Sequence, residues 1–241
     1  MRPIAHCGTT FLVMTGAWAG SSRAQPPHVV SPSDFAARGL PIRADTVDGL
    51  VGDKEKQTYY GYYVYAVAPS SLGARPVYLV TMNYSGGSSE RLFQSDTLAV
   101  DGATLAPLWR HFHARTDSAS IVYSGRHATG WALQNGRNVA VDRQLSDNAF
   151  DAAVVRWIVP LLPLASGYQA TITSFNMWKN AENASTISVT GTEVVQVRDK
   201  KYDAWILAST TGLRRWVDRA TGVIVQAHSE GTLGGRGAWE V

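Results

Sequence analysis

Residues that favour β-strands dominate the chain from residue 57 onward, in short runs separated by turn signals. The run QTYYGYYVYAV at 57–67 is rich in tyrosine and valine, and RPVYLVTMNY at 75–84 follows a turn at 69–74. Turns such as Asp101-Gly102 and Asn135-Gly136 separate later runs, and short strands joined in this way predict an antiparallel meander. Further strands are expected at 90–100, 104–116, 119–125, 129–135, 137–143, 167–176, 185–197, 201–209, 213–218 and 222–228.

One segment, at 148–160, follows a helical period instead. Asp147 can cap it, and Pro160 and Pro163 can end it, because proline donates no backbone hydrogen bond. The apolar positions that recur at helical spacing are Phe150, Val154, Trp157, Ile158 and Leu161. A single amphipathic helix must bury its apolar face against the sheet. We therefore predict a mainly β protein: a single curved antiparallel sheet or half-open β-barrel, with one amphipathic lid or plug helix.

The strand expected at 185–197 has an unusual apolar face. Its residues of one parity are Ile187, Val189, Gly191, Glu193, Val195 and Val197. Because side chains alternate between the two faces of a strand, Glu193 falls among apolar residues unless a bulge at Gly191 shifts the register.

The N-terminal residues 1–24 have the layout of a secretory signal peptide. A basic start precedes an apolar stretch at 11–19, and Ser22-Arg23-Ala24 supplies a small-x-small cleavage pattern. Cleavage there removes Cys7, the single cysteine, so no disulfide is expected. The rest is divided into a proline-containing leader with a short helix at 25–57, an antiparallel β domain at 58–231, and a glycine-rich tail or irregular last strand at 232–241.

The charge balance argues against a nucleic-acid partner. The chain has 22 basic and 19 acidic residues, but Arg2 and Arg23 belong to the expected signal peptide. Basic pairs such as Arg214-Arg215 alternate with acidic and aromatic residues on expected strands, which indicates solvated faces. No run after the signal is long and apolar enough for a transmembrane helix, so no transmembrane span is expected. The predicted localisation is the periplasm of a Gram-negative-type bacterium or the medium.

Two polar features are candidates for chemistry. His111 and His113 point to the same face of a strand and are candidate metal ligands, although no spacing supplies a third ligand and a solvent-facing strand explains them better. Glu193 is a candidate buried acid or base, although a structural carboxylate is commoner there. Nucleophile-elbow, metalloprotease and phosphate-loop motifs are missing from the sequence. We expect no cofactor and a non-enzymatic protein.

Aromatic residues are the richest signal in the sequence. Tyrosines crowd 59–65, and tryptophans recur along the β region. They can line a cavity for a hydrophobic ligand, fill a closed core, or form the girdle of an outer-membrane barrel, although arginines interrupt the strands too often for the last. The candidate ligand-binding residues are Trp131, Trp157, Trp178, Trp205 and Trp216.

Four stretches resemble, in order, the bacterial family called domain of unknown function 3108. They are DTLAVDGATLAPLWRHF (96–112), DNAFDAAVVRWIVPLLPLASGY (147–168), VTGTEVVQVRDKKYDAWIL (189–207) and RRWVDRATGVIVQAHSEG (214–231). The residues that fill the family's pattern are Leu105, Pro107, Arg156, Leu162, Gly167, Gly191, Glu193, Trp216 and Asp218. The resemblance implies a secreted, mostly periplasmic, curved antiparallel β-structure similar to the half-barrels of lipoprotein carriers. It implies no established activity.

Three hypotheses about function follow. The leading one is an exported, non-enzymatic β-protein of the cell envelope that binds a hydrophobic small molecule or lipid in a concave sheet under the 148–160 helix. The second is an envelope assembly or scaffolding subunit with an envelope protein as partner. The third is an uncharacterised hydrolase.

Overall fold

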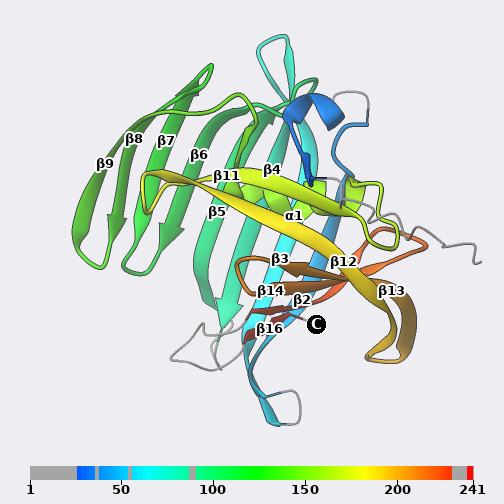
Figure 1. Cartoon of the computed structure of the whole chain (residues 1–241). Coiled ribbons are helices and arrows are strands. Elements are labelled where there is room, and N and C mark those ends of the chain that lie inside the picture. Colours follow the sequence, from blue (N-terminus) through cyan, green and yellow to red (C-terminus); the bar gives the residue numbers. More distant parts are fainter. Residues whose placement is uncertain (1–25, 36–37, 54–55, 87–90, 230–237, 241) are drawn as a thin grey trace, which may run out of the picture.

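The computed structural model describes residues 26–35, 38–53, 56–86, 91–229 and 238–240 of the chain (Figure 1). These residues form sixteen strands in one hydrogen-bonded sheet, together with short helical turns. The signal peptide expected at 1–24 lies outside the described residues. No helix in the described ranges is long and apolar enough to cross a membrane.

A long antiparallel meander forms one half of the sheet. Each strand pairs with the next along the chain, as the tight turns predict. The strands are β2 (Arg43–Asp53), β3 (Lys56–Leu72), β4 (Arg75–Gly86), β5 (Arg91–Asp101), β6 (Pro107–Ala114), β7 (Ser118–Ser124), β8 (His127–Gln134) and β9 (Arg137–Gln144).

A second meander forms the other half, and β16 joins it to the first by pairing with β2. Its strands are β11 (Gln169–Asn176), β12 (Ala181–Val197), β13 (Lys200–Ser209), β14 (Leu213–Asp218), β15 (Ile224–Ser229) and β16 (Ala238–Glu240). Two short strands, β1 (His28–Val29) and β10 (Ala149–Asp151), run parallel to β11 along its outer edge. Figure 1 shows β11 and β12 crossing the hollow side of the curved sheet.

The sheet does not close into a full barrel. Within the described strands, β9 pairs with β8 alone, and β1 and β10 end the sheet on the β11 side. Buried residues of β4, β5, β7, β8, β9 and β11 nevertheless belong to one hydrophobic cluster, so the two halves enclose a common core. The prediction of a mainly β, half-open structure is confirmed.

The helical segment is shorter and later than the 148–160 helix expected from the sequence. Residues 149–151 form β10, followed by the 3₁₀ turn η2 (Ala152–Val154), the single-turn helix α1 (Val155–Ile158) and the 3₁₀ turn η3 (Val159–Leu161). Asp151, not Asp147, caps it by accepting a hydrogen bond from the Ala153 backbone N–H at 2.8 Å. Pairing with β11 holds residues 149–151 extended, so the helix cannot begin before them.

The strands also begin before the boundary expected at residue 58. β2 lies within 25–57 and pairs with β3 on one edge and β16 on the other. Its sequence, RADTVDGLVGD, mixes polar and apolar residues without a clear strand pattern, and pairing on both edges holds it extended. Within the leader at 25–57, where a short helix was expected, the described residues contain the 3₁₀ turn η1 (Pro32–Phe35), and Ala238–Glu240 of the expected tail form β16.

A bulge in β12 divides the core into two clusters. Val189 pairs with Leu207 and Gly191 with Ile206, so Thr190 is the extra residue and the faces exchange there. Val189 packs in the main core, whereas Val195 packs in a smaller cluster on the other side of the sheet. The bulge at Thr190, next to the position that the sequence analysis left open, therefore places Glu193 away from the main core.

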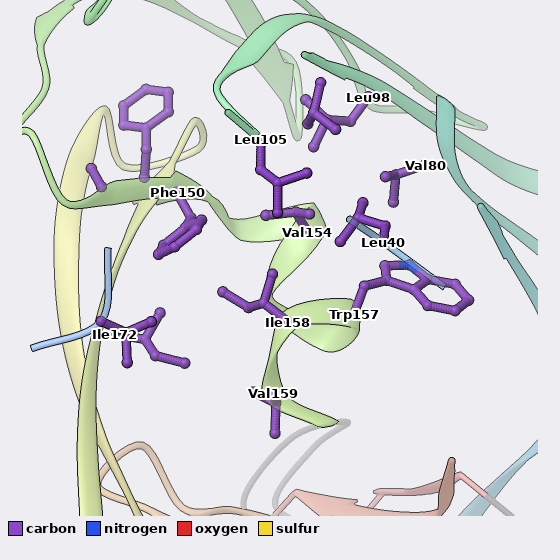
Figure 2. Close-up of a cluster of buried hydrophobic side chains, with 14 of the residues drawn as sticks. Leu40, Val80, Leu98, Leu105, Phe150, Val154, Trp157, Ile158, Val159 and Ile172 are labelled. Atoms are coloured by element: carbon purple, nitrogen blue, oxygen red, sulfur yellow. The ribbon is translucent and has the colours of Figure 1, made fainter. Parts of the chain in front are cut away.

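The main core surrounds the helical segment. Figure 2 shows Val154, Trp157 and Ile158 pointing among buried side chains, with Leu98 on one side and Ile172 on the other. Trp157 is only 2% exposed and is the largest fully buried side chain of the described residues. The segment is therefore a plug within the curved sheet.

Asp101 stabilises the turn between β5 and β6. Its carboxylate accepts hydrogen bonds from the backbone N–H groups of Ala103 and Thr104, from the Thr104 hydroxyl, and from Nε of Arg75 at 2.6 Å. Burial alone would raise the pKa of Asp101, but these hydrogen bonds together lower it from 3.8 to about 2. The charged carboxylate therefore stabilises the folded state.

We expect Asp101→Asn to remove a pH-dependent part of the stability. Because the folded-state pKa is lowered, this stabilisation is complete above the unfolded pKa of 3.8 and is lost as the pH falls to about 2. The variant should be less stable than the wild type by about 1–3 kcal/mol at neutral pH. Urea unfolding between neutral pH and about pH 2 measures the difference, which should shrink below about pH 4. A difference that stays constant would contradict the assignment.

Candidate functional site

A half-open cavity of about 490 Å³ lies in the curved sheet beside the plug. This volume lies within the range of pockets that hold small ligands. Its walls come from β3 to β6 on one side, from the plug, and from β14 and β15 on the other. The lining residues are Tyr60, Tyr63, Tyr65, Val80, Thr81, Met82, Asp96, Arg110, Ala152, Ala153, Arg156, Trp157, Leu213, Arg215, Ala227, His228 and Ser229.

Three tyrosines of β3 form one wall. Tyr63 and Tyr65 share a face of the strand, and their rings stack with centroids 5.7 Å apart. Tyr60 has the other parity, but it is the extra residue of a bulge opposite Gly49 and Leu50 and also lines the cavity. Its hydroxyl lies 3.2 Å from the Tyr63 hydroxyl. The wall is therefore aromatic and carries phenolic hydroxyl groups.

The plug forms the opposite side of the cavity, where it contributes the indole ring of Trp157 and the guanidinium of Arg156. The guanidinium of Arg43 lies 5.5 Å from the Trp157 ring, and that of Arg156 lies 4.0 Å from the centroid of the Tyr65 ring. Cation–π contacts of this kind fix the position of a guanidinium against an aromatic face. Arg156 therefore links the plug to the tyrosine wall.

A buried network of charges lies at the base of the cavity. Arg110 of β6 donates from Nε and Nη2 to the two oxygens of Asp96, at 2.9 and 2.6 Å, and from Nη1 to Asp151 Oδ1 at 2.7 Å. The Tyr123 hydroxyl donates to Asp151 Oδ2. The network joins β5, β6 and β7 to the residue that caps the plug, so it fixes where the plug sits.

The network holds its groups in fixed protonation states. Burial favours a neutral Arg110, but the negative charges of Asp151 and Asp96 outweigh it and raise the pKa of Arg110. Burial, together with the charge of Asp151 and the hydrogen bond to it, strongly raises the pKa of Tyr123. Arg110 stays charged and Tyr123 stays protonated, so the network serves as a structural anchor.

The structure disperses the tryptophans singled out from the sequence. Trp157 lines the cavity. Trp131 is 43% exposed, and Trp178 packs edge-on against Phe112 with centroids 4.9 Å apart. Trp205 lies under the guanidinium of Arg219, and Trp216 is buried in the smaller cluster.

The two polar candidates lie outside the cavity lining. His111 and His113 are exposed on β6, and the described residues contain no group of three or more side chains suited to hold a metal ion. Glu193 accepts a hydrogen bond from Nε1 of Trp216 at 2.9 Å. That bond gives the carboxylate a structural role in the smaller cluster.

Arg156 and Arg215, two of the three arginines that line the cavity, were not expected there from the sequence. The sequence predicts a solvated face for the basic pair Arg214-Arg215, but the strand separates the two. Arg214 is exposed, whereas Arg215 is half-buried and lines the cavity. Arg156 fits the family pattern, but nothing in the sequence around it indicates contact with a ligand. The alternation of faces along 213–218 was the available signal, since Leu213, Arg215 and Val217 share one face.

The fold and cavity define an incompletely closed, barrel-like β protein with an internal plug. Residues 58–228 match the family described as "Protein of unknown function (DUF3108)", and the chain belongs to this family. No curated protein matches the chain significantly. Among solved structures, a beta-barrel-like protein of domain of unknown function DUF1849 from Brucella abortus is similar, with 13% identity and a TM-score of 0.45 over 84% of this chain and 95% of that chain.

Proposed function

We propose that the protein is exported to the bacterial cell envelope and binds a hydrophobic or lipid-like ligand in the cavity beside the plug. The cavity carries this proposal, because it offers about 490 Å³ lined by Trp157, the β3 tyrosines and aliphatic side chains. Apolar and aromatic walls with a few polar groups are typical of small-molecule sites. The signal-like pattern at 1–24 supports export.

The apolar part of the cavity wall favours binding of an apolar ligand. Trp157 and Val80 belong to the main hydrophobic cluster and also line the cavity, so a ligand there extends the buried apolar surface of the protein. Each methylene group removed from water contributes about 0.8 kcal/mol to binding. A chain of several methylene groups is therefore a suitable occupant.

The experiment uses the full chain, expressed in a Gram-negative bacterium and recovered from the periplasm. N-terminal sequencing should find a mature chain that begins at Gln25, and native mass spectrometry should find a bound hydrophobic molecule. Recovery of the uncleaved chain from the cytoplasm would count against export. A ligand-free protein that also ignores added dodecanol would count against cavity binding.

We expect Ala152→Trp to weaken dodecanol binding by about tenfold, because the indole occupies space in the cavity that Ala152 lines. Ala152 is exposed on the cavity wall, so the substitution leaves the buried core intact. Ala140→Trp, on the exposed face of β9, is the matched control and should bind as the wild type does. Fluorescence titration measures both. Equal binding by the two variants would place the ligand elsewhere.

A further inference from the structure

The charges around the cavity have a positive excess on the side formed by the plug and β14. Asp96 and Arg110 line the cavity but are hydrogen-bonded to each other, and Asp151 behind them also accepts from Arg110. Arg156 and Arg215 add two cations to the lining. Three positive and two negative side chains therefore surround the base and this side of the cavity.

Arg156 and Arg215 come to the cavity from different elements. Arg156 lies on α1, with the face of its guanidinium against Tyr65. Arg215 lies on β14 between Leu213, which packs against the main core, and Val217, which belongs to it. Both also interact with other groups of the protein. A guanidinium has five N–H donors, so it can contact a protein group and a bound acid at the same time.

An apolar surface lies next to these cations. Val80, Trp157 and Leu213 line the same cavity and belong to, or pack against, the main core. Leu213 neighbours Arg215 on one face of β14, two residues apart. A ligand that contacts both types of surface must itself carry an acidic group and an apolar chain.

We propose that the cavity ligand is an amphipathic anion, whose acyl chain lies against Trp157, Val80 and Leu213 and whose acidic head group binds Arg215 and Arg156. The inference rests on the proposed function, since it names the class of ligand for the same cavity. A cationic amphipath fits less well, because Arg156 already covers the Tyr65 face that would bind a cation. Arginine is well suited to the head group, since it binds carboxylate and phosphate oxygens in pairs.

The test compares dodecanoate with dodecanol, which has the same chain and no charge. The wild-type protein should bind dodecanoate more tightly, and Arg215→Gln should weaken dodecanoate binding by about tenfold or more. The same variant should change dodecanol binding by less than about twofold, because the contacts to the chain remain. Isothermal titration calorimetry at low ionic strength measures both ligands.

Arg214→Gln is the matched control. It makes the same change one residue away, on the exposed face of β14, and should bind both ligands as the wild type does. Equal wild-type affinity for the two ligands, or equal loss of dodecanoate binding in both variants, would overturn the anionic head-group site while leaving cavity binding intact. Binding of neither ligand would overturn the proposed function and this inference together.

Discussion

Trp157→Ala is expected to lower the free energy of unfolding by about 3–5 kcal/mol. The indole is 2% exposed, packs in the main core and lies beneath the guanidinium of Arg43. Its loss removes apolar burial and leaves space that opens into the adjacent cavity, because the hydrogen-bonded sheet cannot fully collapse into it. Urea unfolding followed by far-UV circular dichroism measures the change.

The matched control for this prediction is Trp131→Ala. Trp131 is 43% exposed on β8, so its truncation should cost less than about 1 kcal/mol. Trp157→Phe should lie between the two, since it keeps an aromatic ring in the core. Similar losses for Trp157→Ala and Trp131→Ala would show that the plug does not support the core.

Arg110→Met is the second large effect, and we expect it to cost about 3–5 kcal/mol or more at neutral pH. The arginine is buried and hydrogen-bonded to Asp96 and Asp151, which are themselves 3% and 1% exposed. Its removal leaves two buried carboxylates close together without a counter-ion. Urea unfolding at neutral pH measures the cost, which arises because burying a charge without a partner is unfavourable.

Two further variants separate charge burial from lost packing. Arg219→Met breaks an exposed ion pair with Asp203 and should cost less than about 1 kcal/mol. Combining Arg110→Met with Asp96→Asn and Asp151→Asn removes all three charges and should recover part of the lost stability. A triple variant that is no more stable than Arg110→Met would mean that the packing of Arg110, rather than its charge, holds the network.

Most of the sheet could be predicted from the sequence because strand patterns are local. A β-rich run and the turn that follows it belong to the same hairpin. The turn Asn135-Gly136, for example, joins β8 to β9, and these strands pair as expected. The start of the plug could not be predicted in this way. Residues 149–151 belong to the apolar pattern that predicts a helix over 148–160. In the structure they form a strand instead, because they pair with β11.

The candidate site was only partly predictable. The sequence indicated the tyrosine run and five tryptophans as candidate ligand-binding residues without distinguishing among the tryptophans. Of those five, only Trp157 lines the cavity. The sequence predicted an exposed side chain for Arg215, as it did for the adjacent Arg214, and only Arg214 is exposed. Which face of β14 turns inward depends on the pairing of β13, β14 and β15, and pairing is not visible in a strand of six residues.

By itself, the sequence determined the β class, the hairpins, the family resemblance and the presence of one helical segment, since each rests on residues close together in the chain. Only the tertiary structure decided which side chains meet. Asp96, Arg110, Tyr123 and Asp151 come from four elements and form one network because the sheet curves around the plug. Pairing of β16 with β2 brings the two meanders together around the cavity. Such contacts depend on curvature and strand order, which no local pattern encodes.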